Sequence, residues 1–124
     1  MTPNAATPAV LVVDADRDTV SLLREWLSAA GWVVLDDTAR SPAVPVHLVL
    51  LDLAYPRQGA ALALQRVALE HDGTPVLALS AMFHAGIEPQ GEVARSLGVA
   101  GVLPKPIRRD ALIDAVQKLS RPPP

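Results

Sequence analysis

Four aliphatic stretches in this chain each end next to a polar or charged side chain. Asp14 and Asp16 follow the first stretch, Asp52 ends the second, Ser80 follows the third and Lys105 lies just beyond the fourth. Short aliphatic runs of this kind are typical of strands that are buried on both faces of a parallel sheet. Ligands bind at the edge where the carboxyl ends of such strands meet. We therefore expect these five side chains to lie close together.

Carboxylates, a hydroxyl and a lysine at one edge suit the metal-assisted handling of a phosphoryl group. Converging carboxylates repel one another unless a cation is present, and Mg²⁺ prefers carboxylate and phosphate oxygens. Asp52 has the most central strand position, so we predict that it is the nucleophile of an acyl phosphate. Lys105 would neutralise phosphoryl charge and Ser80 would donate a hydrogen bond.

Each of these residues taken alone has a simpler interpretation. An Asp after a strand is more often a turn former or a helix cap than a nucleophile. Asp16 could cap the first helix, and we expect Asp18 to do so. Lys105 lies between two prolines and could be a solvated loop residue. The ordered set on successive strand ends favours the functional interpretation over these alternatives.

Strands and helices alternate along the chain, which predicts an α/β fold with a parallel sheet and right-handed crossovers. Five strands fit the doubly wound flavodoxin-like order 2-1-3-4-5, whose switch point lies between strands one and three. The segment 36–45 has two prolines and room for one helical turn at most, so the second helix is expected to be shortened or missing. The predicted strands are 9–13, 32–35, 46–51, 75–79 and 99–103. The predicted helices are about 19–30, 58–70, 91–97 and 109–119.

Length and composition indicate one domain with an aliphatic core. Of 124 residues, 50% are hydrophobic and only 3% are aromatic. We predict a flexible tail over 1–8, a domain over 9–120 and a proline-rich tail or linker start over 121–124. The net charge of −2 gives no electrostatic reason to bind nucleic acid. No apolar run is long enough to cross a membrane, and the absence of cysteine fits a cytoplasmic location.

Residues 9–119 resemble the receiver domains of two-component response regulators. The resemblance rests on Val-Leu-Val-Val-Asp-Ala-Asp-Arg-Asp with Leu-Leu-Arg-Glu-Trp-Leu-Ser-Ala-Ala-Gly, Leu-Val-Leu-Leu-Asp-Leu-Ala-Tyr-Pro, Val-Leu-Ala-Leu-Ser-Ala and Pro-Lys-Pro-Ile. It implies that a histidine kinase or a histidine phosphotransfer protein phosphorylates Asp52, with Ser80 and Lys105 contacting the phosphoryl group. It also implies a cis peptide bond before Pro106, an arrangement that an X-Pro bond permits.

The resemblance implies a magnesium site as well, but the chain departs from the family there. The implied ligands are Asp14, Asp52 and the backbone carbonyl of Ala54. The family usually has a second acidic residue after strand one, as the direct metal ligand, and this chain has Ala15. Asp16 could substitute through a shift of the loop. We therefore expect weakened magnesium binding.

Further departures concern how a signal would leave the site. Val102 occupies the position on strand five where the family usually has an aromatic switch residue, and valine is stiff at χ1. Phe83 or His84, in a long loop after Ser80, could replace that residue; the simpler interpretation is a variable surface loop. His84 could also respond to pH. Ala54 and Met82 have no polar group to orient a hydrolytic water, which predicts slow self-dephosphorylation.

The short segment 36–45 would leave an apolar face near Val33 and Leu35, which a second copy of the chain could cover. Three functions are compatible with these observations. The leading one is a phosphorelay receiver that signals to another protein or to a domain beyond Pro124. The second is a pseudo-receiver, an interaction module that phosphate does not switch. The third, a phosphate-ester hydrolase, usually needs a general acid where this chain has Ala54, so we do not expect an enzyme.

Overall fold

The computed structural model describes residues 8–36, 45–54 and 60–120. In this part of the chain, five parallel strands form one sheet in the order β2-β1-β3-β4-β5. The predicted flavodoxin-like order is therefore confirmed. The strands are β1 (Ala9–Val13), β2 (Val33–Asp36), β3 (Leu48–Asp52), β4 (Val76–Ser80) and β5 (Gly101–Pro104). The helices are α1 (Arg17–Ala29), α2 (Ala60–Glu70), α3 (Glu92–Leu97) and α4 (Arg109–Leu119).

Some predictions fall on residues outside the described ranges. The expected loss of the second helix concerns mainly 37–44, and the predicted tails concern mainly 1–7 and 121–124. The predicted start of α2 near 58 also lies outside. Between the described strands β2 and β3, residues 45–47 contain no helix. None of the described helices combines the length and apolar character needed to cross a membrane.

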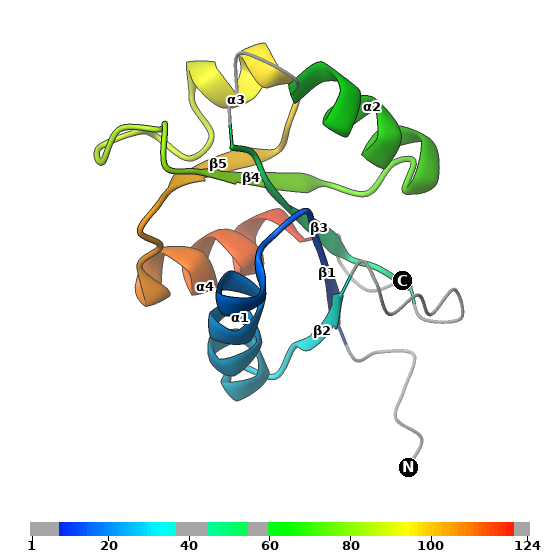
Figure 1. The fold of residues 1–124 in the computed structure, drawn as a ribbon, viewed down its shortest axis with the longest axis vertical. Helices are drawn as coiled ribbons and strands as arrows, with labels where there is room; N and C mark the ends of the chain where they lie inside the picture. Colours follow the sequence, from blue (N-terminus) through cyan, green and yellow to red (C-terminus); the bar gives the residue numbers. More distant parts are fainter. Residues whose placement is uncertain (1–7, 37–44, 55–59, 121–124) are drawn as a thin grey trace.

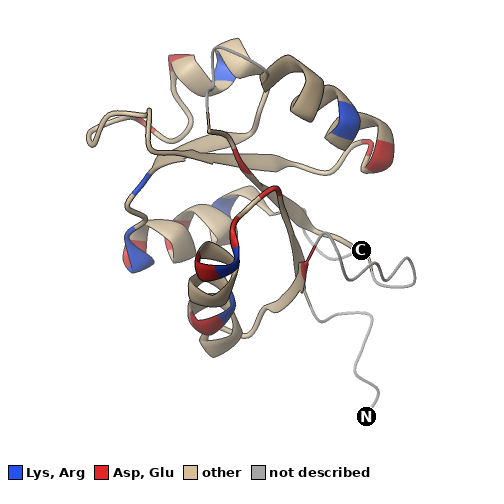
Figure 2. Ribbon diagram, viewed as in Figure 1, with Lys and Arg blue, Asp and Glu red and all other residues tan. Residues whose placement is uncertain are grey.

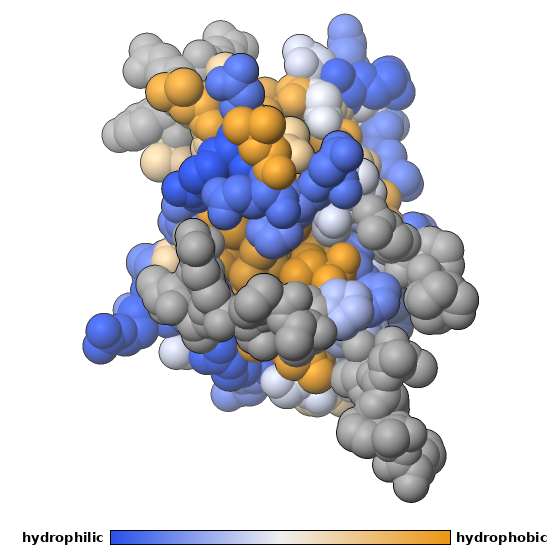
Figure 3. Space-filling view, turned by 90° about the vertical axis from the view of Figure 1, so that its right-hand side faces the viewer, coloured by the Kyte–Doolittle hydropathy of each residue, from blue (hydrophilic) through white to orange (hydrophobic). Residues whose placement is uncertain are grey.

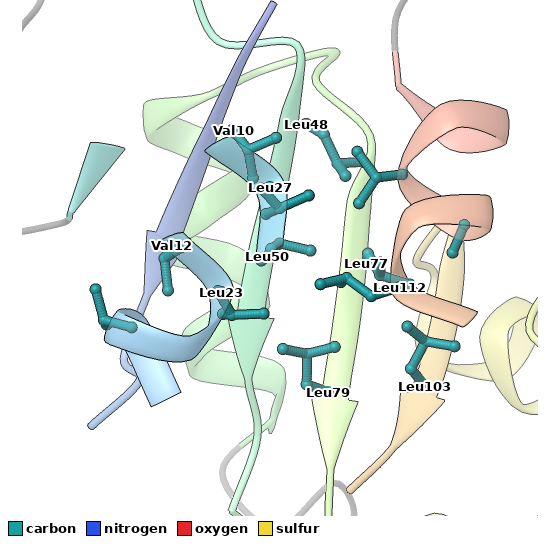
Figure 4. Close-up of a cluster of buried hydrophobic side chains, with 13 residues drawn as sticks. Val10, Val12, Leu23, Leu27, Leu48, Leu50, Leu77, Leu79, Leu103 and Leu112 are labelled. Carbon is teal, nitrogen blue, oxygen red and sulfur yellow. The ribbon is translucent and has the colours of Figure 1, made fainter. Parts of the chain in front are cut away.

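Helices cover both faces of the sheet, with α1 and α4 on one side and α2 and α3 on the other (Figure 1). Successive strand residues point to opposite faces, so each strand contributes to two cores. Val10, Leu50 and Leu77 belong to the core beneath α1 and α4, which Figure 4 shows as a close-packed aliphatic layer. Leu11 and Leu51 belong to the core on the opposite face. The aliphatic core expected from composition is thus built in two layers.

The first helix begins earlier than predicted. Asp16, rather than Asp18, is its N-cap: the backbone N–H of Thr19 donates to Asp16 Oδ2 over 3.4 Å, and the Thr19 hydroxyl donates to Asp16 Oδ1. The Asp18 assignment was wrong because that residue already lies in the first helical turn. A carboxylate there still interacts favourably with the positive end of the helix dipole. The helix ends before Gly31, whose φ of 94° suits a glycine.

Several large hydrophobic side chains reach the surface. In the described part of the chain these are Leu22, Val33, Leu62, Leu69 and Met82. Figure 3 shows hydrophobic atoms at the surface in several places on the face it presents, among hydrophilic ones. Val33, on the edge strand β2, is 40% exposed. Leu35, by contrast, is partly buried against the core on the α2 side. The open apolar face expected near Val33 and Leu35 depends on residues 37–44, outside the described ranges, and stays a prediction.

Candidate functional site

The register of the sheet brings the predicted residues to one edge. Val13 pairs with Leu51, so Asp14 follows β1 at the level of Asp52 on β3. Asp52 pairs with Leu79, and Ser80 pairs with Pro104, so Ser80 and then Lys105 continue the same edge. Figure 2 shows acidic residues where β1 and β3 end and a basic residue after β5. The register thus places the ends of β1, β3, β4 and β5 at one edge of the sheet.

Lys105 and Asp52 are in direct contact. Lys105 Nζ donates to Asp52 Oδ2 over 2.5 Å, although the residues are 53 positions apart. The side chains are only 25% and 11% exposed, respectively. The backbone N–H of Lys105 donates to the carbonyl of Ser80 over 3.0 Å, and the Lys105–Pro106 bond is cis, as the resemblance implies. The result is a charge-assisted hydrogen bond at the carboxyl end of the central strand.

Ser80 is fully buried at the end of β4 and ties the neighbouring loop to the site. Its Oγ accepts a hydrogen bond from the backbone N–H of Met82 over 3.0 Å. Its carbonyl oxygen also accepts from the backbone N–H of Phe83, over 3.3 Å. A hydroxyl that accepts one hydrogen bond still has its own proton to donate. The Ser80 hydroxyl therefore has a proton available for a nearby oxygen.

Asp14 has a partner that the sequence did not suggest. Arg66 Nη2, on α2, lies 3.0 Å from Asp14 Oδ1, and Arg66 Nε lies 3.8 Å from Glu70 Oε1. Asp14 has a φ of 62°, in the left-handed region that aspartate adopts more readily than most residues. Sequence reasoning missed Arg66 because it is 52 positions from Asp14. Its spacing to Glu70 was visible, but that spacing indicates a surface helical pair and not a site residue.

The described donors fit a divalent cation poorly. Asp16 caps α1, and the hydrogen bond from the Thr19 hydroxyl lowers the pKa of the Asp16 carboxyl below its usual value. Ala15 packs against the core beneath α1 and offers no side-chain ligand. Within the described ranges, no group of three or more His, Cys, Asp or Glu side chains is arranged to hold a metal ion. Ala54 is exposed after β3, and a ligand role for its carbonyl stays a prediction.

The predicted switch residues differ in their surroundings. Val102 is fully buried, and Phe83 is 8% exposed and belongs to the same core cluster on the α2 and α3 side. The loop after Ser80 returns to the sheet, where the backbone N–H of Val102 donates to the carbonyl of Pro89 over 2.8 Å. His84 is exposed. Phe83 is therefore an anchor of this loop, and the histidine beside it is not part of the core.

Among curated proteins, the chain is similar to transcriptional regulatory proteins. No protein-family model matches the chain. Over 117 residues the chain is 32% identical to the transcriptional regulatory protein CpxR of Klebsiella pneumoniae, covering 90% of this chain and 49% of that protein. The chain thus spans about half the length of the curated relatives it matches.

Solved structures match along nearly the whole length. A response regulator from Thermotoga maritima superposes with a TM-score of 0.69 at 25% identity, covering 91% of this chain and 97% of that chain. A response regulator receiver protein from Burkholderia phymatum gives a TM-score of 0.68 at 25% identity, covering 90% and 94%. The similarity to these two solved structures therefore extends over about nine tenths of this chain.

Proposed function

Because this chain belongs to the receiver domains of response regulators, we propose that it accepts a phosphoryl group on Asp52 and passes on a conformational signal. The donor would be a histidine kinase or a histidine phosphotransfer protein. The observation that carries the proposal is the 2.5 Å hydrogen bond from Lys105 to Asp52 beside the buried hydroxyl of Ser80. As a signalling module of this kind it would work in the cytoplasm and would not be an enzyme.

The transfer needs a carboxylate nucleophile and positive charge beside it. An Asp52 oxygen would form a bond to phosphorus while the bond from phosphorus to the donor's imidazole nitrogen breaks, and the electron pair of that bond leaves with the imidazole. Charge that gathers on the phosphoryl oxygens is stabilised best by groups that are already in place. Lys105 supplies a positive charge there, and Ser80 supplies a hydroxyl proton.

The signal would leave through the loop that follows Ser80. If the Ser80 hydroxyl turns toward a phosphoryl oxygen, the backbone N–H of Met82 loses the acceptor that it has at 3.0 Å. Phe83 is the next residue, and it packs in the same core as Val102. We therefore assign to Phe83 the part that an aromatic residue on β5 usually has in this family. Phosphorylation would shift the population between two packings of this loop.

A second candidate is a pseudo-receiver that binds partners without a phosphate switch. Two observations favour it: Ala15 provides no carboxylate, and Asp14 pairs with Arg66. The exposed edge at Val33 would be a surface on which a second copy of the chain could pack. This candidate predicts an association that is the same with and without a phosphoryl donor.

Acetyl phosphate distinguishes the two candidates. The chain is incubated with acetyl phosphate with and without Mg²⁺, and the mass of the intact protein is followed with time. The receiver proposal expects one phosphoryl adduct that is absent in Asp52→Asn and present in Asp110→Asn, a matched change at an exposed carboxylate on α4. No adduct in either buffer would overturn phosphorylation and favour the pseudo-receiver. An adduct that persists in Asp52→Asn would also overturn the assignment.

A further inference from the structure

Arg66 places a cation at the carboxyl edge where the family's divalent ion would be expected. Its guanidinium reaches from α2 to Asp14, 3.0 Å away, and Asp14 follows β1 at the level of Asp52. The side chains of Arg66 and Asp14 are 47% and 41% exposed. The contact is therefore partly open to solvent and is not part of the core.

The side chains left at this edge decide whether a divalent metal ion can bind there. An ion pair as exposed as Arg66–Asp14 is weak, so it does not by itself keep a metal ion out. The missing carboxylate at Ala15 matters more. Mg²⁺ is usually bound by one or two carboxylates together with waters and phosphate oxygens, and the two carboxylates left here are paired, Asp14 with Arg66 and Asp52 with Lys105. A doubly charged ion would also meet the positive charges of Lys105 and Arg66.

A guanidinium at this edge can neutralise negative charge, as a divalent ion would. It keeps its charge at any physiological pH and presents N–H donors that match carboxylate and phosphate oxygens in pairs. Asp14, Asp52 and a phosphoryl group together carry several negative charges, which Lys105 alone cannot balance. Arg66 already pairs with Asp14, which lies at the level of Asp52, and its guanidinium carries several N–H donors.

We propose that Arg66 is the cation of this site and that phosphoryl transfer to Asp52 proceeds without a divalent ion. The inference rests on the proposed function. With acetyl phosphate, an Asp52 oxygen bonds to phosphorus, the phosphorus–oxygen bond to acetate breaks, and acetate leaves with the electron pair. No proton is transferred. Arg66 and Lys105 stabilise the charge on the phosphoryl oxygens throughout.

The first test measures the rate of adduct formation with acetyl phosphate in EDTA and in Mg²⁺. The wild-type chain should react at the same rate in both. Arg66→Gln should be slower by about tenfold or more, since loss of one well-placed donor costs that much or more in other sites. Arg66→Lys should react at a rate between those of wild type and Arg66→Gln, because lysine keeps the positive charge but lacks the paired N–H donors of the guanidinium. Arg95→Gln, the same charge change on an exposed residue of α3, should react like wild type.

The second test measures Mg²⁺ binding by calorimetry, which needs no phosphoryl donor. Wild type should not saturate with Mg²⁺. The double variant Ala15→Asp with Arg66→Gln should bind it and should form the adduct faster with Mg²⁺ than in EDTA. Thermal unfolding checks that each variant is folded. Arg66 is partly exposed, so its replacement should leave the fold intact.

The following results would overturn either the role of Arg66 or the acceptor function of Asp52. An adduct that forms in wild type only with Mg²⁺ would overturn the role of Arg66 and keep Asp52 as the acceptor. Saturable Mg²⁺ binding by wild type would overturn the role as well. Equal rates for Arg66→Gln and Arg95→Gln would do the same. No adduct in any buffer would overturn the acceptor function, and with it the inference.

Discussion

Replacing Lys105 by methionine removes the ammonium group that Asp52 contacts at 2.5 Å. The expected cost follows from the burial of the pair. Its side chains are 25% and 11% exposed, between a surface ion pair and a buried one. Surface pairs contribute roughly 0.2–1 kcal/mol, and breaking a buried pair costs roughly 3–5 kcal/mol. We expect Lys105→Met to lower the free energy of unfolding by about 1–3 kcal/mol.

A double-mutant cycle isolates this interaction from other effects of the substitutions. Urea unfolding of wild type, Lys105→Met, Asp52→Asn and the double variant gives the coupling energy. The chain offers a matched control in Lys118–Asp114, a pair 3.1 Å apart whose side chains are 65% and 62% exposed. That helical pair should couple by about 0.5 kcal/mol or less. The Lys105–Asp52 coupling should be clearly larger.

Equal coupling energies for the two pairs would refute this reasoning, because they would mean that burial at the sheet edge adds nothing to the Lys105–Asp52 contact. The same variant also tests the proposed chemistry. Lys105→Met should slow adduct formation from acetyl phosphate, since it removes a charge beside the phosphoryl oxygens. An unchanged rate would exclude Lys105 from the transfer step.

Three further predictions concern the surroundings of the site. Asp16→Ala should destabilise the protein near neutral pH, because it removes the cap of α1. The folded-state pKa of Asp16 is lowered, so the stability lost in this variant should be largest above pH about 4 and should fade as the pH falls through that pKa. Urea unfolding at several pH values measures this. Gly101→Ala should cost about 1–3 kcal/mol in thermal unfolding. Its new Cβ would displace the end of the Leu119 side chain and would lie 3.3 Å from both the buried Leu77 side chain and the Pro89 carbonyl oxygen. Phe83→Leu should leave labelling of Asp52 intact but reduce the phosphorylation-dependent NMR shift of the Val102 amide. An unreduced shift would remove Phe83 from the signal route.

Local patterns in the sequence were enough to predict the sheet. Buried parallel strands appear as short aliphatic runs, and alternating residues supply the two cores, so β1 was predicted with its observed bounds. The helix over 109–119 was also predicted at its observed bounds. The start of α1 was not, because Asp16 and Asp18 are both good caps and only the backbone decides between them. Asp16 has the extended conformation that a cap requires.

The sequence by itself determined which side chains stand at the strand ends, since strand periodicity and chain order place them there. Tertiary structure alone decided their partners. Asp14 pairs with Arg66 and does not form a carboxylate cluster with Asp52 and Asp16 among the described residues. Phe83 lies in the core and not at the surface. The physical reason is that such contacts join residues far apart in the chain. They depend on helix placement, on a left-handed backbone at Asp14 and on the reach of one long side chain, none of which leaves a periodic mark in the sequence.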